Sequence, residues 1–236
     1  MGAMEEIRHW GAEALGLVLR TDCVCCGRVI ANAGLPICRS CALELDRPPE
    51  RINPKTEVLP TFASGPYGGA HRALVLAAKD HVRAAAAQIM GRVWAASWEF
   101  LAAGGHLPSP QLSRCVLVPA PTRPTAIKQR GGDIVTVAAQ HATREFPLAT
   151  VLPVATISDA APDSVGLGRR QRRQSLARYL RMDIGRVGVL KKYAEDGCAV
   201  IIVDDVMTTG ATVSQLALAL ASRGISVTGA LALCHA

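Results

Sequence analysis

The sequence predicts an α/β protein in which helices flank a parallel sheet, with a small cysteine-rich module in front of it. From Val58 onward, short apolar runs rich in Val and Ile alternate with Ala- and Leu-rich helical stretches. This alternation is typical of a parallel sheet with helical crossovers. The runs are continuously apolar, which indicates strands buried on both faces. Five of the eight cysteines lie between Cys23 and Cys41, which sets this segment apart from the rest.

Length and composition agree with this architecture. A chain of 236 residues that is 50% apolar can form one well-buried domain and a small appendage. The net charge of +7 favours anionic partners such as phosphates, nucleotides or nucleic acid. The longest uncharged stretch, 206–222, is interrupted by polar residues, and Glu5 and Glu6 stand where a signal peptide carries positive charge. We therefore expect no membrane insertion and a cytoplasmic location.

The chain divides into four expected segments. Residues 1–20 have the apolar spacing of one amphipathic helix, and residues 21–46 form the cysteine module. Residues 47–57 are polar and contain three prolines, which favours a linker. Residues 58–236 form the α/β domain.

Within the α/β domain the pattern predicts three helices and four strands. A strand that begins at Cys115 ends at Val118 because Pro119 follows it. The expected helices cover 69–102, 134–144 and the stretch with Val213, Leu216, Ala217 and Leu220 on one face, and the other expected strands cover 149–154, 198–203 and 225–233.

Two Cys-x-x-Cys pairs, Cys23 with Cys26 and Cys38 with Cys41, are separated by eleven residues. Pairs at this spacing can place four thiolates around one Zn²⁺ ion, which would be structural because no coordination position stays open. Cys25 is the spare thiol, since only Cys23 leaves a two-residue gap before Cys26. A redox pair is the alternative, although such motifs usually occur singly within a βαβ unit.

The segment 200–212 carries most of the chemistry. A buried strand ends in Asp204 and Asp205, a loop rich in Thr and Gly follows, and then a helix begins. In parallel sheets, ligands bind beyond the carboxyl ends of the strands, and a Thr/Gly turn at a helix N-terminus forms a nest for an anion. The carboxylates would hold sugar hydroxyls or face a cation such as Mg²⁺. The alternative is an ordinary strand–turn–helix with incidental Asp and Thr residues.

This segment resembles the phosphoribosyl pyrophosphate (PRPP) motif of type I phosphoribosyltransferases, in which four apolar and two acidic residues precede Thr-Thr-Gly-x-Thr. The resemblance implies that Asp204 and Asp205 hold the ribose hydroxyls as catalytic residues, and that Mg²⁺ accompanies PRPP. It also implies that the 5-phosphate is bound by Met207, Thr208, Thr209, Gly210, Ala211 and Thr212.

The strand that ends at Val118 runs into a stiff turn with a cation, and in the same family the loop at this place binds pyrophosphate. Rigid backbone amides and an Arg suit a polyanionic leaving group. A proline-capped strand end with a surface Arg is the alternative. The residues assigned to this pyrophosphate loop are Pro119, Ala120, Pro121, Thr122, Arg123 and Arg130.

A four-cysteine ribbon ahead of a type I phosphoribosyltransferase-like domain resembles the ComF family, which includes competence protein F and its gluconate-uptake relative. Val118–Pro121 is similar to the Val-Pro-x-Pro loop of that family. Gly65–Gly69, followed by the helix that reaches Lys79 and Asp80, resembles its entry into the transferase domain. Arg130–Gly131 begins an Arg-Gly-Phe-Asn-Gln run in the family, but Gly132, Asp133 and Ile134 replace its last three residues. The resemblance covers nearly the whole chain.

Two hypotheses for the function follow. In the first, the protein is a phosphoribosyltransferase that binds PRPP or a related phosphosugar and transfers the phosphoribosyl group to an acceptor. In the second, it is a non-enzymatic module for DNA uptake that contacts single-stranded DNA and competence proteins such as a partner helicase, as the resemblance implies. The Arg-rich stretch 169–173 fits three interpretations: an active-site flap, a nucleic-acid contact or a solvated surface.

Overall fold

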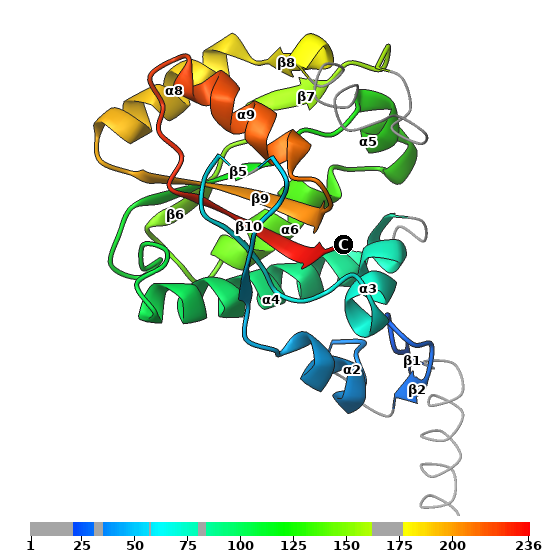
Figure 1. Ribbon diagram of the computed structural model, residues 1–236. Helices are drawn as coiled ribbons and strands as arrows, with labels where there is room; N and C mark the ends of the chain where they lie inside the picture. The colour runs from blue at the N-terminus through cyan, green and yellow to red at the C-terminus, as the bar shows by residue number, and fades with distance from the viewer. Residues whose placement is uncertain (1–20, 31–34, 57, 80–83, 162–176) are drawn as a thin grey trace, which may run out of the picture.

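The computed structural model describes residues 21–30, 35–56, 58–79, 84–161 and 177–236, and its centre is a six-stranded sheet (Figure 1). The strand order across this sheet is β3-β4-β10-β9-β5-β6. Its strands are β3 (Glu50–Ile52), β4 (Thr61–Ala63), β5 (Cys115–Pro119), β6 (Ala149–Val151), β9 (Ala199–Met207) and β10 (Gly229–His235). Five of the six are mutually parallel, and β3 pairs antiparallel to β4 at one edge.

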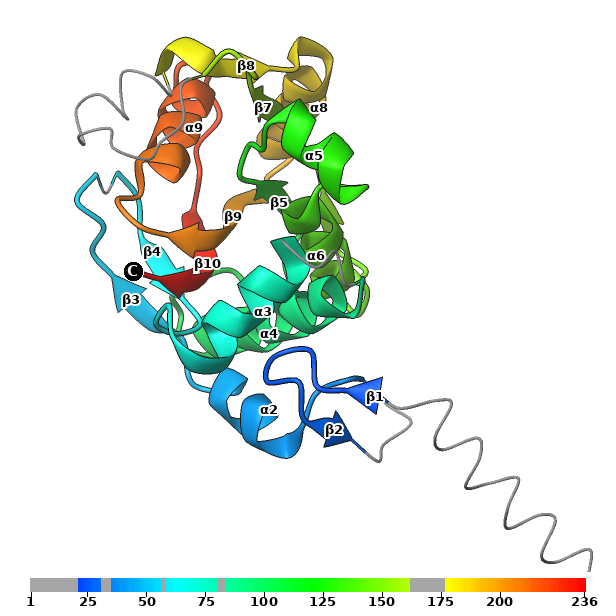
Figure 2. The ribbon, with the colours of Figure 1, turned by 90° about the vertical axis from the view of Figure 1, so that its right-hand side faces the viewer.

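Helices cover both faces of the sheet, as the continuously apolar strands predict (Figure 2). Side chains of β9 alternate between the two faces, so Val200 and Ile202 belong to one hydrophobic cluster, whereas Ile201 and Val203 belong to the other. The first cluster lies under α8 (Ile184–Glu195) and α9 (Ala211–Ala221), and the second lies under α3 (Gly69–Lys79), α4 (Ala84–Ala103) and α6 (Ile134–Thr143). The mixed α/β architecture is thereby confirmed.

The cysteine module is a short antiparallel pair followed by a helix. Strand β1 (Thr21–Asp22) pairs with β2 (Val29–Ile30), and α2 (Arg39–Leu45) packs beside α3. Its buried side chains, which include Val24 and Leu45, join the same cluster as the inner face of α3. The module therefore adds to the core of the larger domain.

Several elements differ from the sequence expectation. Residues 50–52 of the expected linker pair with the sheet as β3, and β10 begins at Gly229, later than expected. The hairpin of β7 (Ala155–Ile157) and β8 (Leu180–Met182) has no counterpart in the prediction, and neither has α8. The expected helix over 1–20 lies outside the described residues. Within the described parts of the chain, no helix is both long and apolar enough to cross a membrane.

Close contact between α4 and α6 depends on a glycine. A Cβ atom at Gly91 would lie 2.6 Å from the carbonyl oxygen of Ala138 and 2.9 Å from the backbone nitrogen of Ala142. Backbone atoms of a packed helix cannot move aside locally, so the two helices would have to separate. The absence of a side chain at this position sets the distance between α4 and α6.

Gly91→Ala should therefore lower the free energy of unfolding by about 1–3 kcal/mol, the usual cost of overpacking. Gly188→Ala in α8 is the matched control, because no atom lies within 4 Å of its added Cβ. That change should raise stability by about 0.5–1 kcal/mol, since Ala has the higher helix propensity. Urea denaturation measures both, and equal effects at the two sites would contradict the packing argument.

Candidate functional site

The candidate site lies beyond the carboxyl ends of β5 and β9, which are neighbours in the sheet. The chain leaves β5 through α5 (Pro124–Arg130) and α6 toward β6, whereas it leaves β9 through α9 toward β10 on the other side. The two connections also cover opposite faces of the sheet. Such a switch point opens a crevice between diverging loops, which is the usual ligand site in an open parallel sheet.

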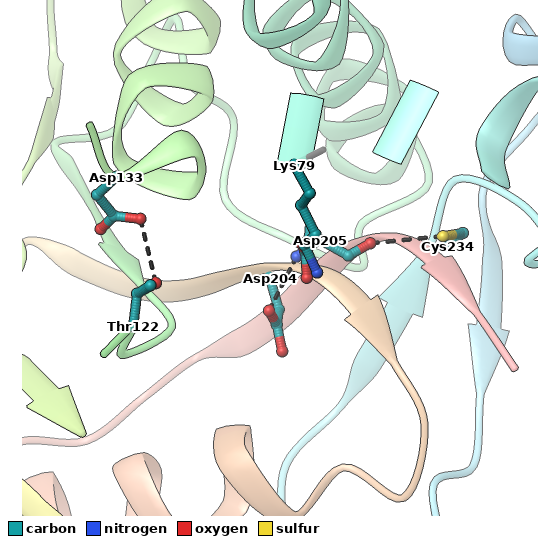
Figure 3. Close-up of polar contacts among 6 residues, drawn as sticks. All are labelled: Lys79, Thr122, Asp133, Asp204, Asp205 and Cys234. Carbon is teal, nitrogen blue, oxygen red and sulfur yellow. Dashed lines mark hydrogen bonds and ion pairs between the residues drawn. The ribbon is translucent and has the colours of Figure 1, made fainter. Parts of the chain in front are cut away.

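Asp204 and Asp205 lie on opposite sides of β9 at this edge. Figure 3 shows Lys79 reaching from α3 to Asp205, whereas the carboxylate of Asp204 points to the other side of the strand. Asp204 is half-buried, and its Oδ1 accepts a hydrogen bond from the backbone N–H of Asp205 over 2.9 Å. Asp205 is buried and its Oδ2 forms an ion pair with the Lys79 Nζ. The sequence pattern identified the two carboxylates but not the lysine.

The two adjacent carboxylates shift the pKa values of the ionisable groups in the site. Burial and the negative charge of Asp205 raise the pKa of Asp204 well above its ordinary value. Burial tends to lower the pKa of Lys79, but the charge and hydrogen bond of Asp205 outweigh it and raise the pKa. Lys79 therefore stays protonated and neutralises Asp205, whereas Asp204 forms no ion pair within the described part of the chain.

The loop between β9 and α9 turns through a left-handed glycine. Gly210 adopts a left-handed φ of 74° immediately before the helix, where a residue with a side chain would be strained. A Cβ atom there would also lie 2.7 Å from the Cβ of Pro54. The motif residues Met207, Thr208, Thr209, Gly210, Ala211 and Thr212 all fall between the end of β9 and the first turn of α9.

Residues of the expected linker hold this loop in place. The Thr56 Oγ1 donates a hydrogen bond of 2.7 Å to the carbonyl oxygen of Thr209, and the Ser214 hydroxyl donates to the carbonyl oxygen of Thr56. These contacts join residues more than 150 positions apart in the sequence. Sequence reasoning missed Thr56 because nothing local marks it as a partner of the loop.

The loop after β5 is fixed by a network around Asp133. The Thr122 Oγ1 donates to Asp133 Oδ1 over 3.2 Å (Figure 3). The Thr136 Oγ1 donates to Asp133 Oδ2 over 2.6 Å. The backbone N–H of Ala120 donates to the Val203 carbonyl oxygen over 2.8 Å, so the loop starts beside the aspartates. Asp133 thus connects the loop to α6. This residue is one of the three that differ from the Arg-Gly-Phe-Asn-Gln run of the ComF family.

Four thiols form the candidate metal centre. The Sγ atoms of Cys23, Cys26, Cys38 and Cys41 all lie within 4.8 Å of one another, and Cys25 does not belong to this group. The Cys26 and Cys38 Sγ atoms are 3.6 Å apart, close to the roughly 3.8 Å edge of a tetrahedron with zinc–sulfur bonds of about 2.3 Å. A hydrogen bond with Ser40 lowers the pKa of Cys38 to about 6, which favours the thiolate form. The group could hold a structural Zn²⁺ ion.

The metal centre is connected to the crevice through two helices. Cys38 precedes the first residue of α2 and Cys41 lies within it. From the same helix, the Glu44 Oε1 accepts a hydrogen bond of 2.9 Å from the backbone N–H of Ala70, at the first turn of α3. Helix α3 ends at Lys79, so a zinc ion that orders α2 also supports the helix that carries the ion-pair lysine.

No protein-family model and no curated protein matches the chain. The resemblance to the ComF family and to type I phosphoribosyltransferases therefore stays a prediction from the motifs. The Arg-rich stretch 169–173 lies outside the described residues.

Zinc content distinguishes the four thiols from the spare one. Cys25→Ser should keep about one zinc ion per chain, whereas Cys41→Ser should lose most of it, since a structural site uses four ligands. Elemental analysis of protein purified under reducing conditions provides the measurement. Equal zinc loss in the two variants would reassign the ligands.

Opposite stability changes are expected for the two aspartates. Asp204→Asn should raise the free energy of unfolding at pH 8 by about 0.5–2 kcal/mol, because an amide needs no ionisation beside Asp205. The folded protein holds the Asp204 proton more tightly than the unfolded chain does, so ionisation costs stability as the pH rises. The advantage should therefore shrink as the pH falls through the raised pKa, and vanish below the unfolded value of about 4.

Asp205→Asn is the matched comparison, and it should lower stability by about 1–3 kcal/mol because it leaves the Lys79 ammonium without its counter-ion. Urea unfolding between pH 4 and pH 8 measures both variants. Changes of the same sign at the two positions would contradict this division of charge.

Proposed function

We propose that the crevice binds PRPP, or a closely related phosphosugar, together with Mg²⁺, and that the protein is a phosphoribosyltransferase of the ComF type. The observation that carries this proposal is the position of the PRPP-like segment. Its two aspartates and its Thr/Gly loop lie at the switch point of the parallel sheet, next to the loop after β5. An incidental strand–turn–helix would have no reason to occupy that position.

The ligand would be held at three places. The 5-phosphate lies in the loop 207–212, where backbone N–H groups and threonine hydroxyls donate to it at the first turn of α9. The ribose hydroxyls donate to Asp204, whose carboxylate forms no ion pair with the described residues. The pyrophosphate lies against the loop 119–123, where the backbone is rigid and Arg123 supplies a positive charge.

In the transfer, an acceptor nucleophile forms a bond to the anomeric carbon of the ribose as the bond to pyrophosphate breaks and the pyrophosphate leaves with its electron pair. Mg²⁺ supplies charge neutralisation for the pyrophosphate when it is bound. The residues of the chain hold the sugar and the departing anion in fixed positions, which is the main source of rate in reactions of this kind. Asp204 also favours the positive charge that develops on the ribose ring.

A second function is favoured by the arginines near the hairpin β7–β8. Arg178, Arg181 and Arg186 lie on or beside this hairpin and are exposed, and exposed arginines neutralise nucleic-acid phosphates. In that case the protein would be a non-enzymatic competence module that contacts single-stranded DNA. Loss of DNA affinity on substitution of these arginines, with no PRPP binding by the intact protein, would favour this function.

Titration calorimetry tests the main proposal. Zinc-loaded protein should bind PRPP with a Kd between about 1 μM and 1 mM when Mg²⁺ is present. It should bind at least about tenfold more weakly in buffer that contains neither Mg²⁺ nor a chelator, since pyrophosphate charge is then unscreened. Asp204→Asn should weaken binding by about 10–100-fold, the value of a charged hydrogen bond. Since that variant should be more stable than the natural protein, unfolding cannot account for the loss.

Asp196→Asn is the control, because this exposed aspartate lies just before the amino end of β9, at the opposite edge of the sheet. It should leave PRPP affinity unchanged. Folded, zinc-loaded protein that releases no heat with PRPP under either condition would refute the proposed function.

A further inference from the structure

Lys79 is a cation that belongs to the crevice but not to the sequence motif. It ends α3, and its ammonium pairs with Asp205 from the side of the sheet opposite Asp204 (Figure 3). The Lys79 side chain is 30% exposed, whereas that of Asp205 is 10% exposed. The ammonium therefore lies between a buried carboxylate and the solvent, and an ammonium has three N–H donors.

The predicted pyrophosphate loop includes a second cation from another element. Arg130 is the last residue of α5, and its positive charge acts to lower the pKa of Lys79. Among the described residues, Lys79 forms an ion pair with Asp205, and no carboxylate forms an ion pair with Arg130. The positive charges of Lys79 and Arg130 and the negative charges of Asp204 and Asp205 all act at this edge of the sheet. A bound polyanion would add favourable interactions with the two cations.

The two sides of β9 would then receive different parts of the ligand. Asp204 points toward the side of α9, where the phosphate loop lies, and Lys79 lies on the side of α3 and α6. Because β5 adjoins β9, with Pro119 opposite Val203, the loop after β5 begins close to the aspartates. The Lys79 ammonium lies on the side of the sheet that α6 covers, and Thr122 of this loop donates a hydrogen bond to Asp133 at the start of α6.

We propose that Lys79 is a binding residue for the pyrophosphate group of the phosphosugar, acting with Arg130, while Asp205 holds its ammonium in position. This inference rests on the proposed function and extends it by a residue outside both motifs. The ion pair orders the long lysine side chain in the free protein, so little of its rotamer freedom is left to lose on binding. Asp205 accordingly holds Lys79, whereas Asp204 receives the sugar.

The test compares two variants that differ only at Lys79. Asp205→Asn retains the ammonium and frees it from its counter-ion, whereas Lys79→Met combined with Asp205→Asn removes both charges and leaves neither buried and unpaired. Each variant is titrated in a calorimeter with inorganic pyrophosphate without divalent cations, and separately with ribose 5-phosphate. Thermal unfolding followed by circular dichroism establishes that each variant is folded.

The double variant should bind pyrophosphate about 10–100-fold more weakly than Asp205→Asn, as expected for one lost charged hydrogen bond. Ribose 5-phosphate affinity should differ by less than about threefold between the same two variants, because the ligand has no pyrophosphate. Lys191→Met is the control: it removes an exposed lysine, 3.9 Å from Glu195 in α8, and should change neither affinity.

Equal pyrophosphate affinities in the two variants would overturn the proposal and would reduce Lys79 to a positioning residue for Asp205. If the double variant does not fold, Lys79→Gln and Lys79→Arg in the natural chain replace it, and only the arginine should preserve pyrophosphate affinity. If the natural protein binds neither ligand, the proposed function fails and this inference fails with it. If it binds both while every Lys79 variant binds pyrophosphate equally well, only the role of Lys79 is refuted.

Discussion

Two neighbouring carboxylates at the end of a buried strand impose the main electrostatic constraint on this protein. Side chains alternate along β9, so one aspartate must face the helices on each side of the sheet. Lys79 neutralises Asp205 on one side, whereas burial and the charge of Asp205 raise the pKa of Asp204 on the other. An ionised Asp204 lowers the stability of the free protein, and hydrogen bonds from the hydroxyls of the proposed sugar ligand would offset this cost. Binding sites commonly lower fold stability in this way.

The features that the sequence predicted are those with a local signal. The strands around Val116 and Val200 are apolar on both faces, and the four metal-site cysteines are recognisable from their spacing alone. Helix α8 was not predicted because only Val187 and Leu190 face the core, so its periodic signal is weak. The hairpin β7–β8 has strands of three residues each, which are too short to show a pattern.

The contacts that complete the site could not be predicted, because each joins elements that are distant in the sequence. Lys79 meets Asp205, and Thr56 meets Thr209, only after the strands have assembled. A lysine at a helix end and a threonine after a proline are ordinary surface residues until the topology places them. The motif thus indicated where the ligand would bind, whereas the supporting contacts required the three-dimensional structure.

The cysteine module and α3 share one hydrophobic core, so the module cannot be removed without affecting the α/β domain. Cys23, Cys41 and Leu45 lie in one continuous hydrophobic cluster with Leu74 and Val75. Removal of the residues that precede Arg47 would expose the apolar face of α3 to water. It would also remove Glu44, which accepts a hydrogen bond from the first turn of α3. A shortened recombinant fragment would therefore carry a solvent-exposed apolar patch prone to self-association, so expression trials are best begun from the whole chain.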